Sequence, residues 1–155
     1  MFTEILGLPA HPLWVHAPVV LVPLLALLSA VYALVPGWRN HTGWAAVTLS
    51  VVAPLAAGGA VLSGGEFLAT RYAGNAPADL LTHRDFGTLT FWCALALGVV
   101  TVAFVLLTRM RERGGATPSW VLIAIESALL ILAAASMYFV IRTGHTGATS
   151  VWETS

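Results

Sequence analysis

Four histidines of this chain occupy positions from which they could bind a metal ion or the iron of a haem. His11 and His16 open the first of four apolar stretches, His83 precedes the third and His145 follows the fourth. If the stretches are helices that alternate in direction, all four histidines fall at the same end of the bundle. A histidine in or beside a membrane-spanning segment is costly unless it is paired or ligated, so each one is a candidate functional residue.

The composition indicates an integral membrane protein. Hydrophobic residues make up 58% of the 155 residues and charged residues only 9%, whereas a soluble domain carries about 25% charged residues. The formal net charge of zero argues against nucleic-acid binding, which needs a basic surface. The single cysteine, Cys93, excludes an intramolecular disulfide and a CxxCH sequence for covalent haem attachment.

Four apolar stretches are each long enough to cross a bilayer, which takes about 20 residues. We therefore expect one all-α domain over residues 1–155, an integral membrane four-helix up-and-down bundle, with spans at about 13–35, 44–63, 86–108 and 120–141. The N-terminus lacks the basic region of a secretory signal, so we expect the first helix to remain in the protein.

The arginines predict the orientation, because cytoplasmic loops carry an excess of positive charge. The first and third loops contain Arg39, Arg109, Arg111 and Arg113, and the opposite side contains Arg71, Arg84 and Arg142. The two sides differ by only one arginine, and the cluster in the third loop decides the predicted orientation. Both termini and the histidine end are therefore expected outside the cytoplasm.

The spacing of the histidines indicates which of them bind directly. His11 and His16 are five residues apart, about 140° around a helix, so a regular helix would not direct both at one metal. We expect the deeper His16 to pair with His83, because the first and third helices of such a bundle face each other diagonally. His11 and His145 would then be secondary, as a third ligand of a metal ion, a partner of a haem propionate or a hydrogen-bond donor.

Three charged residues complete the candidate site. Arg71 and Arg84 lie at the histidine end and could pair with haem propionates, because a guanidinium matches a carboxylate. Glu126 is the one acid within a predicted span, toward the cytoplasmic side. It could hydrogen-bond to a neighbouring helix, or act as a proton relay or a quinone-site acid, and its distance from the histidines favours the first role.

Small residues occur where they could serve two purposes. Those of the second stretch are Ala56, Gly59, Ala60, Ser63 and Gly64. They would allow close helix packing or leave room for a flat macrocycle, and packing is the commoner role. Gly144 and Gly147 flank His145, which fits a helix C-terminus that would let the imidazole turn inward.

These motifs together resemble a bacterial family of predicted four-helix membrane proteins, domain of unknown function 2231. The resemblance rests on HPLWVHAP, LSGGEF, His83 and GHTGATSVW. The family's histidine motifs fall on His11, His16, His83 and His145. Relatives are sometimes fused to Rieske or c-type cytochrome domains, which implies redox work at the outer face of the bacterial inner membrane. This sequence has no such domain, so a redox partner would be a separate protein.

Three function classes remain open. The leading one is a b-type cytochrome-like electron-transfer protein that holds haem b between histidines. The second is a zinc or copper site with His16, His83 and His145 as ligands. The third is a non-catalytic scaffold subunit of a membrane redox complex. HExxH, GxSxG and CxxC are absent, and whether the protein is an enzyme stays undecided. The lipid bilayer is the expected partner, with a redox protein or a quinone, and a homo-oligomer is possible.

Overall fold

The computed structural model describes residues 4–5, 8–73 and 75–152. Four long helices form most of it: α2 (His16–Leu34), α3 (Arg39–Tyr72), α4 (Ala78–Glu112) and α5 (Ser119–Trp152). The short helix α1 (Ala10–Trp14) precedes α2, and the 3-10 helix η1 (Pro36–Trp38) joins α2 to α3. Two strands of two residues each, β1 (Glu4–Ile5) and β2 (Leu8–Pro9), pair antiparallel before α1. These strands are too short for the sequence to have indicated them.

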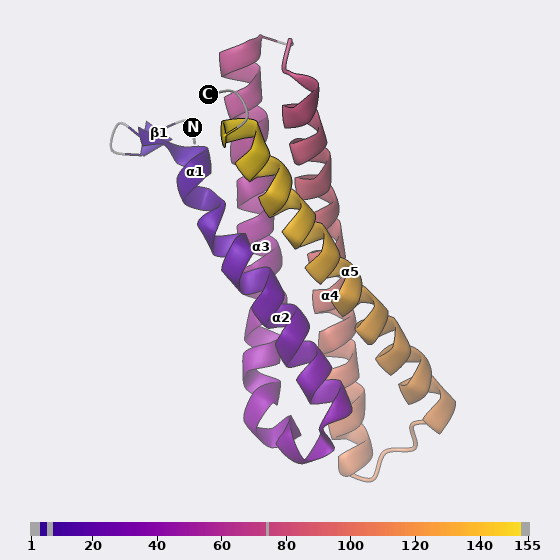
Figure 1. The fold of residues 1–155 in the computed structure, drawn as a ribbon. Helices are drawn as coiled ribbons and strands as arrows, with labels where there is room; N and C mark the ends of the chain where they lie inside the picture. The colour runs from indigo at the N-terminus through magenta and orange to yellow at the C-terminus, as the bar shows by residue number, and fades with distance from the viewer. Residues whose placement is uncertain (1–3, 6–7, 74, 153–155) are drawn as a thin grey trace.

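The long helices alternate in direction and pack as a bundle (Figure 1), which confirms the predicted all-α up-and-down fold. Each one is long and apolar enough to cross a membrane. Helix α3 packs between α2 and α4, and α5 packs against α4 and α2. Helices α2 and α4 therefore lie diagonally across the bundle, as the sequence-based argument assumed.

Helices α3, α4 and α5 extend beyond the predicted spans. Helix α4 contains 35 residues, about 52 Å at about 1.5 Å per residue, whereas the hydrocarbon core of a bilayer is about 30 Å thick. The sequence placed a helix end near Gly144 and Gly147, but α5 continues to Trp152. Each glycine costs a helix only about 1 kcal/mol, which is too little to end a helix that packs along α4.

Proline accounts for the boundary between α1 and α2. Pro18 has no backbone N–H, so the carbonyl of Trp14 loses its helical hydrogen-bond donor. The flanking bonds survive, because Val15 N donates to His11 O at 3.1 Å and Val19 N donates to Val15 O at 3.3 Å. Helix α1 therefore leads directly into α2 (Figure 1) and lies beside α3.

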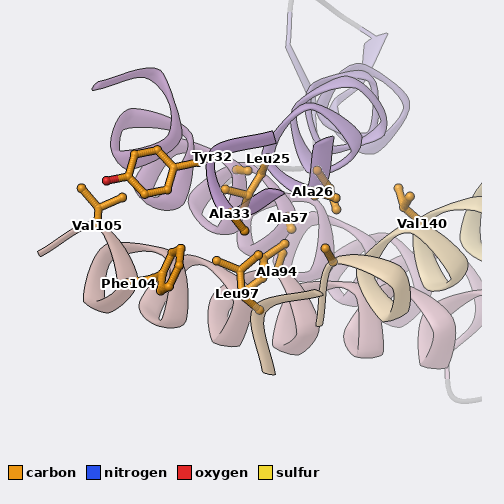
Figure 2. Close-up of a cluster of buried hydrophobic side chains, with 14 residues drawn as sticks. Leu25, Ala26, Tyr32, Ala33, Ala57, Ala94, Leu97, Phe104, Val105 and Val140 are labelled. Atoms are coloured by element: carbon orange, nitrogen blue, oxygen red, sulfur yellow. The ribbon is translucent and has the colours of Figure 1, made fainter. Parts of the chain in front are cut away.

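Small side chains bring the helices close together in the core. Figure 2 shows the buried cluster, in which alanines of several helices lie among larger side chains such as Tyr32, Leu97 and Phe104. Gly98 of α4 lies so close to α3 that a Cβ atom there would come within 2.5 Å of the carbonyl oxygen of Ser50. Close packing of this kind holds membrane helices together, because lipid supplies no hydrophobic drive between them.

Two hydrogen bonds cross the diagonal of the bundle. Tyr32 Oη lies 2.8 Å from Thr108 Oγ1, and Thr101 Oγ1 donates to Ser29 Oγ at 2.9 Å. All four groups are buried, so each bond satisfies polar atoms that would otherwise be costly in an apolar interior. The bonds fix α2 against α4 and so fix the relative heights of the segments that carry the histidines.

A paired-histidine centre at one end of the bundle

The structure brings His11 and His83 together. His11 lies on α1 and His83 lies near the beginning of α4, and both side chains are half-buried. Their ring centroids are 6.3 Å apart and the ring planes are inclined by 76°. Two segments that are distant in the sequence thus place two imidazoles side by side at the end of the bundle that carries the chain termini (Figure 1).

Helix α5 orients the ring of His83. Its Nδ1 lies 3.0 Å from the carbonyl oxygen of Thr143 and 3.3 Å from Thr146 Oγ1. A carbonyl oxygen can only accept, so Nδ1 carries the proton and donates it. The lone pair of the neutral ring is therefore on Nε2.

Helix α3 orients the ring of His11 in the same way. Its Nδ1 lies 3.1 Å from Ser63 Oγ, and the Ser63 hydroxyl donates its only proton to the carbonyl oxygen of Ala60 at 3.0 Å. Ser63 Oγ must then accept from His11 Nδ1, which leaves the lone pair of His11 on Nε2. Metal-binding histidines are commonly held by such a hydrogen bond from the nitrogen that does not bind the metal.

Two glycines make room for the two rings. A Cβ atom on Gly64 of α3 would lie 2.9 Å from Cε1 of His11, and one on Gly147 of α5 would lie 2.9 Å from Cε1 of His83. Both distances are shorter than ordinary carbon contacts of about 3.5–4.0 Å. A third glycine, Gly59, accommodates the ring of Trp14 in the same manner. The small residues of α3 therefore pack against side chains of α1.

Burial and charge favour the neutral form of His11. Desolvation by burial lowers the pKa of His11 below its ordinary value of 6.5, and the neighbouring His83 imidazole lowers this pKa further. A hydrogen bond with the backbone of Ala60 acts in the opposite direction. The neutral imidazole is the form that binds metals, so the environment keeps His11 ready to act as a ligand at neutral pH.

We expect the bundle to lose stability as the pH falls below about 6.5. The folded-state pKa of His11 is lower than its unfolded value, so the unfolded chain takes up a proton first and acid favours unfolding. The contribution is complete above the unfolded pKa and is lost as the pH falls toward the folded one. Thermal unfolding of the cofactor-free protein in detergent between pH 8 and pH 5 measures it. The decrease in Tm should be smaller in His11→Gln, and an equal decrease would contradict this assignment.

The other two candidate histidines lie on the surface. His16 of α2 and His145 of α5 are exposed. In the part of the chain that the structure describes, no three His, Cys, Asp or Glu side chains are grouped for a metal ion. The predicted set of His16, His83 and His145 is thus not assembled here, and a ligand role for His16 or His145 stays a prediction. Of the two N-terminal histidines, His11 is the one beside His83.

The two arginines of the histidine end are also exposed. Arg84 pairs with its neighbour Asp85 at 3.3 Å, with side chains 51% and 68% exposed, and such a surface pair contributes at most about 1 kcal/mol. Arg71 lies in the last turn of α3. Pairing of Arg71 or Arg84 with haem propionates therefore stays a prediction.

Glu126 lies at the other end of the bundle. It lines a cleft of about 420 Å³ together with Thr108 and other residues. Thr108 follows His83 on α4 by 25 residues, about 37 Å along a helix. This separation confirms that Glu126 is far from the histidines, while its predicted role as a proton or hydrogen-bond site stays open.

The sequence did not single out Thr143 and Thr146, which orient the ring of His83. It indicated Ser63 and Gly64 only as small residues for packing or a macrocycle, and Gly147 only as a neighbour of His145, so their contacts with the rings were not predicted. The small and hydroxyl residues of LSGGEF and RTGHTG were the sequence feature that could have indicated these ring contacts. Nothing in the sequence showed which ring each of them faces.

Fold and site together define a four-helix membrane protein with a pair of half-buried imidazoles at one end. The chain belongs to the family described as "Predicted membrane protein (DUF2231)", which matches residues 7–155. This confirms the resemblance drawn from the motifs. No curated protein and no solved structure matches the chain.

Proposed function

We propose that this membrane protein transfers electrons as a b-type cytochrome, in which His11 and His83 would hold a haem b. The observation that carries the proposal is the pair itself: two half-buried rings, each held through Nδ1, with centroids 6.3 Å apart. His11 replaces His16 as the proposed partner of His83, because His11 is half-buried and lies beside His83, whereas His16 is exposed.

The number of donors fits this group. Zinc sites use three or four protein ligands, whereas two histidines are enough to hold a haem. Bound haem would supply a one-electron couple. The residues of this chain would bind the iron through Nε2, and Ser63 and Thr143 would keep the rings in the required tautomer.

A copper ion is the second candidate, and the packing around His11 favours it. The ring of Phe67 stacks on His11 with centroids 6.3 Å apart, and Gly64 lies against the same imidazole. A single ion needs less space beside these groups than a macrocycle does. Imidazole suits copper as well as zinc, but a site with two protein ligands falls short of the usual zinc coordination.

An absorption spectrum and a metal analysis of the purified protein test both candidates. Haem binding predicts a Soret band and an α-band that sharpens on reduction with dithionite, at about one haem per chain. A colourless protein with about one copper per chain would support the second candidate instead. Protein from haem-replete and metal-replete cells that contains neither would overturn both proposals and favour the scaffold role.

We also propose that the paired-histidine centre faces the outside of a bacterial inner membrane, with both termini on that side. The support is the arginine cluster in the loop at the opposite end of the bundle. The electron partner would then be a separate redox protein on the outer side, or a quinone in the membrane.

Cysteine labelling tests this orientation in a Cys93→Ala background. Asn40 is the second residue of α3 and Asn75 lies three residues beyond its end, so the two exposed side chains are at opposite ends of the bundle. A membrane-impermeant maleimide should label Asn75→Cys in intact cells and Asn40→Cys only after permeabilisation. The reverse pattern would overturn the orientation.

A further inference from the structure

A cleft opens at the end of the bundle that lies opposite the histidines. In Figure 1 the beginning of α5 stands away from the ends of α2 and α4 at this end. The cleft has a volume of about 420 Å³, within the range of about 300–1,000 Å³ that is usual for ligand sites. Its charged residues are Arg39, Arg111, Glu112 and Glu126, and its apolar ones include Phe104 and Leu122.

Hydrogen bonds and aromatic rings hold Arg39 in this cleft. Its Nε donates to the carbonyl oxygen of Tyr32 at 3.1 Å and its Nη2 donates to that of Ala33 at 3.3 Å. The guanidinium carbon lies 5.5 Å from the ring centroid of Phe104 and 5.6 Å from that of Tyr32. Arg39 therefore caps the end of α2 and presents a fixed positive charge to the cleft.

The charges of the cleft do not neutralise one another directly. Among the residues that the structure describes, Arg39, Glu112 and Glu126 form no ion pair. Glu126 is half-buried and Arg39 is partly buried. A half-buried carboxylate near the edge of a membrane is costly unless a cation or a hydrogen-bond donor meets it. Arg111 donates to Ser119 Oγ at 3.3 Å, so the cleft offers charges of both signs that no ion pair neutralises.

The cleft lies at the depth of the lipid headgroups. The uncharged run of α4 ends at Arg109, and Arg111 lines the cleft two residues later. Leu122 and Ile123 form its apolar side, and Ile123 is 63% exposed where a bilayer would surround the helix. A molecule in the cleft could thus keep its polar part between the charges and its apolar part in the membrane.

We propose that this cleft binds the headgroup of a zwitterionic phospholipid that carries a primary ammonium, such as phosphatidylethanolamine. Arg39 and Arg111 would contact the phosphate, because guanidinium groups suit phosphate oxygens. Glu112 and Glu126 would receive hydrogen bonds from the ammonium. An anionic lipid without an amine, like a quinone, would offer no hydrogen-bond donor to the half-buried Glu126. The proposal is independent of what the histidines bind.

Competition among lipids tests the proposal. Purified protein in detergent is mixed with equal amounts of phosphatidylethanolamine, phosphatidylcholine and phosphatidylglycerol, and the retained lipid is measured by native mass spectrometry. We expect several-fold more phosphatidylethanolamine than either other lipid, because the choline group cannot donate hydrogen bonds and glycerol carries no positive charge. Equal retention of the three, or a preference for phosphatidylglycerol, would overturn the proposal.

Variants assign the preference to this cleft. The double variant Glu112→Gln, Glu126→Gln should lose the preference for phosphatidylethanolamine over phosphatidylcholine, and Arg111→Gln should reduce the retention of all three lipids. Arg113→Gln and Asp79→Asn are the matched controls, because both residues are exposed and lie outside the cleft, and they should behave as the unaltered protein does. An unchanged preference in the double variant would overturn the proposal. Circular dichroism verifies that each variant is folded. If Arg111→Gln does not fold, the lipid competition with the unaltered protein still tests the preference for phosphatidylethanolamine.

Discussion

Replacing either His11 or His83 by alanine should abolish binding of the haem or copper ion. Each ring supplies one imidazole of the pair, and the described part of the chain gathers no third His, Cys, Asp or Glu side chain there that could take over its bond to the metal. Absorbance of the Soret band, or copper per chain if the protein is colourless, measures the loss. The variants should remain folded, because both rings lie at the end of the bundle and outside the core cluster.

The exposed histidines are the matched controls for this experiment. His16→Ala and His145→Ala should keep the cofactor, because both side chains are on the surface of their helices. The pairing predicted from the sequence gives a different pattern, with loss in His16→Ala and retention in His11→Ala. Loss of the cofactor in His16→Ala but not in His11→Ala would therefore overturn the proposed pair and support the pairing of His16 with His83.

Adding a single methyl group at Gly147 or Gly64 should weaken cofactor binding about 10–100-fold, the usual effect of disturbing the groups that orient a metal ligand. A Cβ atom at either position would lie 2.9 Å from the ring of His83 or His11, so the ring must move and its Nδ1 hydrogen bond must lengthen. Titration of the apoprotein of Gly147→Ala and Gly64→Ala with haem or copper measures the change in Kd.

Two other glycines separate this effect from general changes in helix stability. Gly65 and Gly144 lie one and three residues from the first pair, and a Cβ atom at either would meet nothing within 4 Å. Gly65→Ala and Gly144→Ala should bind normally and gain stability of up to about 1 kcal/mol, because alanine favours a helix. Unchanged affinity in Gly147→Ala and Gly64→Ala would show that the glycines do not position the rings.

The sequence was sufficient to predict the architecture and the end of the molecule that carries the histidines. Long apolar runs define membrane helices almost independently of tertiary contacts, and short loops then make neighbouring helices antiparallel. The diagonal placement of α2 and α4 followed from these two rules and is confirmed. The resemblance to the family is confirmed as well.

The choice between His11 and His16 could not be made from the sequence. It depends on α1, which continues the direction of α2 past Pro18 and lies against α3. The purposes of the glycines depended on distant contacts in the same way, since Gly147 faces a ring on α4. The preference of glycine for helix ends predicted a helix terminus near Gly147, but α5 packs against its neighbours and continues beyond this residue.

The length of α4 determines which kind of partner can reach the paired-histidine centre. Between Asp85 and Arg109 the helix has no charged residue, a distance of about 35 Å that spans the nonpolar layer of about 30 Å. His83 precedes this run, so the two imidazoles stand at the boundary between headgroups and water. An electron or a metal ion could then be exchanged with a water-soluble carrier that docks from one side. The nonpolar helices would then anchor a centre that works at the membrane surface, and they would not carry electrons or metal ions across the membrane.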